Sequence, residues 1–156
     1  MQKLSDYINK IVVFLAGTSF LIMTILIFTQ VIFRYIFGNS LSWSEELSRF
    51  LFIWATILGI SVGVKRNFLL SITFVKDKFP SGLRNMLDIF IDIGILIFAF
   101  FLIVYGWELT QKVQFQLSPA MRISMSYVYV VVPISGIVII IHLLSNWYDT
   151  IIKRVR

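Results

Sequence analysis

The feature that most constrains this sequence is an uninterrupted run of 23 residues without a formal charge, from Ile11 to Phe33. A helix needs about 20 apolar residues to cross the hydrocarbon core of a bilayer, which is about 30 Å thick. The run is too long for the hydrophobic region of a signal peptide, and Arg34, Tyr35 and Phe37 follow it where small residues would mark a cleavage site. We therefore expect a first membrane-spanning helix that is retained.

Three further apolar runs predict three further spanning helices. The expected fold class is an all-α integral membrane protein, with one membrane domain over residues 1–156. Hydrophobic residues make up 58% of the chain and charged residues 14%, which leaves more apolar surface than a soluble domain of this size could bury. Ser42 and Glu45 fit a capping box that starts the second helix, and Pro133 predicts a kink in the fourth. The expected spans are residues 11–33, 43–65, 86–107 and 125–148.

The segment between the second and third spans has an amphipathic pattern. Phe68, Ile72, Val75 and Phe79 would share one helical face, with lysines nearby. This pattern suits a short helix lying in the membrane interface. An extended loop fits the same residues, so both structures stay open.

The distribution of basic residues predicts the orientation, because loops rich in lysine and arginine stay in the cytoplasm. Of the 14 basic residues, ten lie on the side that holds the N-terminus, the loop between the second and third spans, and the C-terminus. We therefore predict that both termini are cytoplasmic. The four basic residues on the other side are Arg34, Arg49, Lys112 and Arg122.

The composition excludes several kinds of chemistry. The sequence has no cysteine and a single histidine, His142, so disulfides, thiolate sites and histidine-based metal clusters are ruled out. It carries no nucleotide-binding loop and no nucleophile–base motif. The net charge of +6 comes from residues that flank the apolar runs, which indicates membrane topology and not nucleic-acid binding. We expect no enzymatic activity, no cofactor, no metal site and no nucleic-acid partner.

Three ionisable residues in the third and fourth predicted spans, Asp88, Asp92 and His142, are candidates for ion coupling, because charge within a membrane is costly and often functional. Asp88 and Asp92 lie four residues apart and share one face of the third span. They could form a cation or proton site; alternatively, Asp88 stabilises the start of its helix near Arg84 and Asp92 bonds a polar group on another helix or subunit. His142 could bind haem, but a haem in such a bundle usually needs two axial ligands, which favours a structural role.

The second span carries small residues at a spacing typical of close helix packing. Ala55, Gly59 and Gly63 recur every four residues along one face. Small side chains at this spacing let two helix backbones approach closely in a membrane. The pattern predicts a packing face, against either a helix of this chain or another protein.

A group of charged and aromatic residues precedes that face. Glu45 and Arg49 form a favourable i,i+4 pair, which accounts for both. Trp43 and Glu46 have no such local explanation and suit a docking surface. The expected partner interface consists of Arg34, Trp43, Glu45, Glu46 and Arg49.

The same stretch resembles a known family. Arg34-Tyr35 followed by the run from Asn39 to Arg49 is similar to the arginine–aromatic, Trp-x-Glu-Glu and Leu-x-Arg pattern of one group of membrane proteins. These are the small membrane subunits, DctQ-like or Q, of tripartite ATP-independent periplasmic (TRAP) transporters. The resemblance covers nearly the whole chain and extends to Leu58–Val62 with Lys65-Arg66, to Ser118–Ala120, and to Tyr129 and Pro133.

The resemblance implies a function and a set of partners. A periplasmic substrate-binding protein would deliver an organic acid to this chain and a large membrane transport subunit, paired one to one in the lipid of the bacterial inner membrane. The large subunit would carry the substrate and sodium sites of the symport, and this chain would act as its scaffold. Many members have a histidine after the basic pair, followed by an aspartate; Leu69 or Leu70 and Thr73 stand at those places here. The organic acid is not specified by the sequence.

Two other functions stay open. Small four-helix proton-coupled transporters often keep a glutamate within their first span, whereas Ile11 to Phe33 contains none. A non-catalytic membrane anchor for another complex, including a haem-bearing anchor of a respiratory enzyme, would have the same number of spans. The single histidine opposes the haem-bearing form.

Overall fold

A computed structural model of the chain describes residues 2–39, 41–66 and 81–155. The helices are α1 (Gln2–Ile36), α2 (Ser42–Lys65), α4 (Ser81–Lys112), α5 (Ser126–Tyr129) and α6 (Val131–Val155). Four helical segments in the described part are long and apolar enough to cross a membrane, with α5 and α6 together forming the fourth. The expected all-α fold with four spans is therefore confirmed. The predicted interfacial helix and the departures at Leu69, Leu70 and Thr73 lie outside the described residues.

The helices α1 and α4 extend beyond the predicted spans. α1 begins at Gln2, well before the uncharged run starts at Ile11, and α4 covers Ser81–Lys112 where residues 86–107 were expected. An apolar run marks the part of a helix that lies in the hydrocarbon core of the bilayer. The helical hydrogen bonding can continue into the polar layers on either side. The polar first turns of α1 therefore belong to the same rigid rod as its spanning part.

The start of α2 differs from the predicted capping box. Leu41 holds the N-cap position and Ser42 is the first helical residue, with no side-chain capping bond. Instead, the Ser44 hydroxyl lies 2.8 Å from the Leu41 carbonyl oxygen and 3.3 Å from Oε1 of Gln30. The capping-box prediction was wrong because the helix begins one residue earlier than the motif requires. The Ser44–Gln30 contact links the start of α2 to α1.

The fourth span is interrupted before Pro133. α5 ends at Tyr129 and α6 begins at Val131, which places Pro133 in the first turn of α6. Proline has no N–H to donate to the carbonyl of Tyr129, and its ring crowds that carbonyl. The next residue, Ile134, donates a long bond of 3.4 Å to the Val130 carbonyl. The helical hydrogen bonding is interrupted at Val130, but the backbone there keeps a helical conformation, with φ −60° and ψ −22°. The kink stays a prediction.

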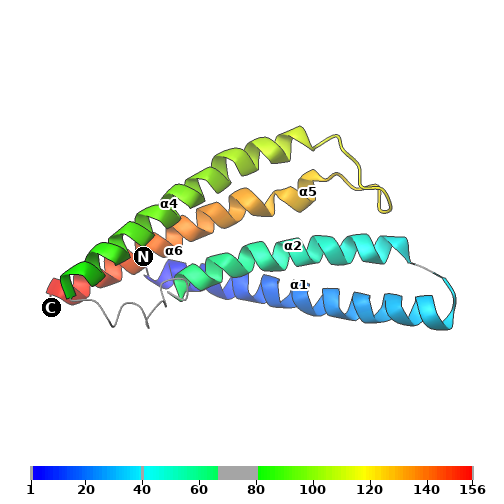
Figure 1. Cartoon of the computed structure of the whole chain (residues 1–156), viewed down its shortest axis with the longest axis horizontal. Coiled ribbons are helices and arrows are strands. Elements are labelled where there is room, and N and C mark those ends of the chain that lie inside the picture. Colours follow the sequence, from blue (N-terminus) through cyan, green and yellow to red (C-terminus); the bar gives the residue numbers. More distant parts are fainter. Residues whose placement is uncertain (1, 40, 67–80, 156) are drawn as a thin grey trace.

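The four spans pack as two antiparallel pairs. α1 packs against α2, α4 packs against α6, and α6 also contacts α2. In Figure 1 the two pairs lie close together at the end that holds both chain termini, here called the terminal end. They spread apart toward the opposite end, here called the loop end, which holds the α1–α2 connection and the loop between α4 and α5.

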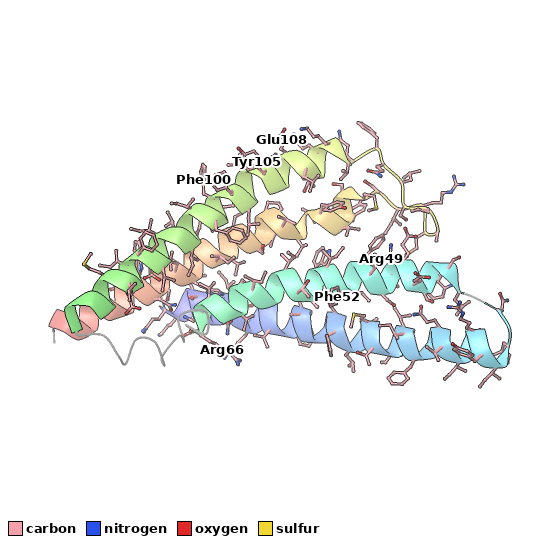
Figure 2. The ribbon with its side chains drawn as sticks, viewed as in Figure 1. Arg49, Phe52, Arg66, Phe100, Tyr105 and Glu108 are labelled. Carbon is pink, nitrogen blue, oxygen red and sulfur yellow. The ribbon has the colours of Figure 1, made fainter. Side chains whose placement is uncertain are left out.

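The central helix of the bundle is α6. One buried cluster joins it to α1 and α2 through Val12, Leu58, Val131 and Val138. A second cluster joins it to α2 and α4 through Val64, Ala99 and Ile139. By contrast, side chains such as Phe100 and Tyr105 of α4 are exposed and project from the bundle (Figure 2). This arrangement leaves broad apolar surfaces on α1 and α4, as expected for helices that face lipid.

The helices α4 and α6 approach each other closely at two glycines. A Cβ atom on Gly106 would stand 3.0 Å from Cδ of Pro133. A Cβ atom on Gly136 would stand 2.9 Å from the backbone oxygen of Ala99. Both distances are shorter than ordinary contacts, so the two backbones approach as closely as they do only because these positions lack side chains.

Candidate functional site

The loop end is held together by one carboxylate of α2. Oε2 of Glu46 accepts hydrogen bonds from the backbone N–H of Ala120 at 2.9 Å and of Met121 at 2.8 Å. These two residues lie at the tip of the loop between α4 and α5, more than 70 positions away in the sequence. Glu46 therefore ties the first helix pair to the second at the end where the pairs spread apart. We call this arrangement the Glu46 clasp.

The loop that Glu46 holds has its own internal structure. The Ser118 N–H donates to the Ile123 carbonyl at 2.8 Å, and the Met125 N–H donates to the Gln116 carbonyl at 2.9 Å. Arg122 has a φ of 57°, in the left-handed region, and turns the chain at the tip. The clasp and these bonds together satisfy backbone groups that an irregular loop would otherwise leave to water.

The other predicted interface residues are exposed. Glu45 and Arg49 pair at 3.3 Å, with about two thirds of each side chain exposed (66% and 67%). Trp43 is 46% exposed and Arg34 is also exposed. The structure thus brings Glu45 and Arg49 together as expected and gives Glu46 a partner within the chain, which the sequence did not suggest.

Aromatic and apolar side chains are prominent on the loop end. Phe115 is 87% exposed and Tyr35 is 81% exposed, and neither lies within a packed helix interface. We call five of these residues the loop-end aromatics: Tyr35, Phe37, Trp43, Phe115 and Tyr127. Aromatic side chains of this kind sit at membrane–water boundaries or in protein interfaces.

Asp92, the carboxylate placed deepest in the third span, has a partner on another helix. The indole N–H of Trp147 on α6 donates to Oδ2 of Asp92 at 2.6 Å. The other oxygen, Oδ1, is buried and has no hydrogen-bond partner in the described part of the chain. Asp88 lies one turn earlier on α4. Asp92 therefore connects α4 to α6 near the terminal end.

His142 lies fully buried at the terminal end. Its Nδ1 is 2.8 Å from the hydroxyl of Ser5, a residue of α1 that is also fully buried. Nearby, Lys65 of α2 pairs with Asp6 of α1 at 2.9 Å. These contacts join α1, α2 and α6, and they explain why α1 stays helical and docked beyond its apolar run.

The predicted packing face of α2 is not filled at its centre. A Cβ atom on Gly59 would meet nothing within 4 Å, and the neighbouring Phe52 and Ile60 are 52% and 41% exposed. Ala55 and Gly63 are only half-buried. We call Phe52, Thr56, Gly59 and Ile60 the open face of α2. Close packing of the Ala55, Gly59 and Gly63 face against a second protein stays a prediction.

The donor groups in the described ranges do not gather into a metal site. Within these residues no group of three or more histidine, aspartate or glutamate side chains could hold a metal ion. Asp92 is bonded to Trp147, His142 contacts Ser5, and Lys65 pairs with Asp6. What the arrangement offers is contact surfaces held in fixed positions, at the loop end and on the open face of α2.

Comparison with known proteins gives matches to one family. Residues 23–152 match the model of the family described as "Tripartite ATP-independent periplasmic transporters, DctQ component". A putative TRAP transporter small permease protein of Haemophilus influenzae is 31% identical over 156 residues, which cover 97% of this chain and 94% of that protein. The sialic acid TRAP transporter small permease protein SiaQ of Vibrio cholerae is 28% identical over 116 residues, covering 74% of this chain and 67% of SiaQ.

Part of a longer protein also matches. The sialic acid TRAP transporter permease protein SiaT of Haemophilus influenzae is 29% identical over 131 residues. The match covers 84% of this chain but only 21% of SiaT. The chain therefore spans about a fifth of that relative's length, and the rest of SiaT has no counterpart here.

Proposed function

Since this chain belongs to the DctQ family, the small permease subunits of TRAP transporters, we propose that it scaffolds a large transport subunit during sodium-driven uptake of an organic acid. The observation that carries the proposal is the family match over residues 23–152, in a multi-pass protein of the bacterial inner membrane. SiaT and the isethionate TRAP transporter permease protein DctMQ of Oleidesulfovibrio alaskensis support it, because the matched segment is 21% and 17% of these longer permease proteins. The part of such a protein outside the matched segment would correspond to the large subunit with which a separate small subunit pairs.

The internal contacts of the ionisable residues support a scaffold rather than a transport pathway. A pathway through this chain would need ionisable groups lining a route across the membrane. Asp92 instead bonds Trp147, and His142 contacts Ser5. Both contacts hold helices together, which suits a subunit that stays fixed while its partner moves. In this proposal the substrate and sodium sites belong to the large subunit.

The open face of α2 is the proposed contact with the large subunit. Gly59 has free space above it, and Phe52 and Ile60 beside it are exposed. A partner helix could approach closely at Gly59, because a residue without a side chain allows backbone contact. A partner helix would pack more closely against this face than lipid does, and the complex would gain the additional van der Waals energy.

The loop end is the proposed docking area for a periplasmic substrate-binding protein. Both termini lie at the terminal end, and the sequence places ten of the 14 basic residues on that side of the membrane. The terminal end would then be cytoplasmic and the loop end periplasmic. The Glu46 clasp would hold the loop and the loop-end aromatics in a fixed arrangement for docking.

Copurification tests the scaffold. The chain carries an affinity tag and is expressed together with its large permease subunit, and the complex is isolated in mild detergent. Gly59→Leu should reduce recovery of the large subunit at least tenfold, because the added side chain fills the space a partner helix would use. Gly94→Leu is the matched control, since Gly94 on α4 also has nothing within 4 Å. Equal recovery with both variants would rule out the open face as the contact.

Transport tests the remainder of the proposal. The two subunits are reconstituted in proteoliposomes, and uptake of labelled sialic acid, a C4-dicarboxylate or isethionate is followed in the presence of the binding protein. Uptake should require an inward sodium gradient and both subunits. Uptake by the large subunit alone at the full rate would contradict a scaffold role, and uptake driven equally well without sodium would contradict the coupling.

A further inference from the structure

The terminal end of α1 carries a stripe of exposed cationic and aromatic side chains. Lys3, Tyr7, Lys10 and Phe14 follow one another at helical spacings of four, three and four residues, and so they share one face. Tyr7 is 65% exposed and Phe14 is 71% exposed, and both lysines are exposed. We call this face the lysine–aromatic stripe. Nothing in the proposed function uses it.

The opposite face of the same helical segment is docked. Ser5 is fully buried against His142, and Val12 is 5% exposed within the cluster that joins α1, α2 and α6. Because one face is fixed in the bundle, the lysine–aromatic stripe is held pointing outward. Its side chains therefore present a defined surface and do not belong to a frayed helix end.

The charges of the stripe are not neutralised within the described ranges. Asp6, the acidic residue nearest to it on α1, pairs with Lys65 of α2 at 2.9 Å. Among the described residues no ion pair is formed by Lys3 or Lys10. Arg66 at the end of α2 is exposed and adds positive charge at the same end of the bundle. This surface is complementary to an anion.

The depth of the stripe matches the polar layer of a bilayer. The apolar run starts at Ile11, so Lys10 lies at the edge of the hydrocarbon core. Lys3 lies about 10 Å further out along the helix, from a rise of about 1.5 Å per residue. The headgroup layer on each side of a bilayer is about 5–7 Å thick, and lysine side chains reach into it from either position. Phe14, one turn deeper, lies beside the acyl chains.

From this position and charge we propose that the lysine–aromatic stripe binds an anionic phospholipid. The lysines would hold the phosphate of the headgroup, and the Tyr7 hydroxyl would donate a hydrogen bond to it. Phe14 would pack against the upper part of an acyl chain. The inference does not depend on the transporter role, because it rests on α1 and its position relative to the membrane.

Lipid titration of the purified full chain tests the proposal. The chain in mild detergent is titrated with phosphatidylglycerol or phosphatidylcholine, and bound lipid is counted by native mass spectrometry. Phosphatidylglycerol should bind more tightly than phosphatidylcholine. A lysine near an anionic surface strengthens binding roughly fivefold, so Lys3→Gln with Lys10→Gln should raise the Kd about 25-fold. Free glycerol phosphate should not displace the lipid.

Two further double variants separate the stripe from general positive charge. Lys3→Arg with Lys10→Arg keeps the charge and should retain binding. Arg34→Gln with Lys112→Gln removes two exposed cations from the loop end and should leave binding unchanged. Equal affinity for both lipids, or an equal loss of binding in the loop-end variant, would overturn the proposal.

The same titration is repeated on the chain copurified with its large permease subunit. Retained selectivity for phosphatidylglycerol supports a lipid site on the assembled protein. Selectivity that is present in the chain alone and lost in the complex would show that a protein covers the stripe, and it would also overturn the proposal.

Discussion

Trp147 donates its indole N–H to Asp92 at 2.6 Å, and this bond joins α6 to α4, two helices that also approach closely at Gly106 and Gly136. A carboxylate in a transmembrane helix is the usual candidate for an ion-coupling site. Here one of its oxygens already holds α4 to α6. The contact gives Asp92 a structural role that can be separated from transport by experiment.

Trp147→Phe should destabilise the chain by about 1–3 kcal/mol, because it leaves the buried Asp92 carboxylate without its donor. Asp92→Asn keeps an oxygen that can accept the bond and should cost less. Unfolding in detergent, followed by tryptophan fluorescence or circular dichroism, measures both. If Asp92→Asn abolished sodium-dependent uptake while stability and assembly stayed normal, the bond to Trp147 would not account for the role of Asp92.

Glu46→Ala should release the loop between α4 and α5. Two bonds to a charged carboxylate are lost, and charge-assisted bonds contribute about 1.5–3 kcal/mol each when buried, less at a half-exposed site such as this one. Hydrogen exchange at the amides of Ala120 and Met121 should accelerate at least tenfold. Glu45→Ala is the matched control, because its pair with Arg49 is exposed. Equal exchange in the two variants would show that the clasp is not formed.

Gly106→Ala and Gly136→Ala should each destabilise the α4–α6 contact by about 1–3 kcal/mol through overpacking. The backbone oxygen of Ala99 stands 2.9 Å from the position of a Cβ on Gly136 and cannot move as a flexible side chain would. Gly94→Ala has free space and should be neutral or slightly stabilising, since alanine favours helix more than glycine does. Thermal unfolding in one detergent compares the three. Equal losses at all three positions would contradict the close approach.

Ser5→Ala should cost about 1–3 kcal/mol, because it leaves Nδ1 of the buried His142 without a partner. The position lies outside the apolar run, so a loss of this size would also show that the polar start of α1 is docked. Ser42→Ala serves as the control, because Ser42 is exposed and makes no capping bond. A double-mutant cycle with His142→Ala isolates the pair, and a coupling energy near zero would argue against the contact.

The four spans and the disturbance of the fourth helix near Pro133 could be predicted because their causes are local. The length of an apolar run determines whether the segment spans the bilayer. Proline at position 133 disturbs helical hydrogen bonding whatever the helix packs against. The ends of α1 and α4 could not be predicted, because polar turns continue a helix when another helix supports them. The burial of Ser5 against His142 is the evidence for that support in α1.

The contacts between helices were harder to predict than the helices. The spacing of Ala55, Gly59 and Gly63 is visible within one segment, yet the close approach of α4 and α6 uses Gly106 and Gly136 on different helices. No periodicity within a single helix reveals such a pair. The bonds from Glu46 to the distant loop likewise depend on how that loop turns, so the sequence identified Glu46 as unexplained but could not name its partner.

The position of both termini at one end of the bundle has a consequence for gene fusion. An even number of crossings returns the polypeptide to the side on which it started. A second membrane protein that begins on that side could be joined directly after α6, whereas one that begins on the opposite side would need an additional odd number of crossings in the junction. In the longer permease proteins SiaT and DctMQ, the sequence next to the matched segment can therefore be examined for such a helix, and its presence or absence would report on which side the remaining portion begins.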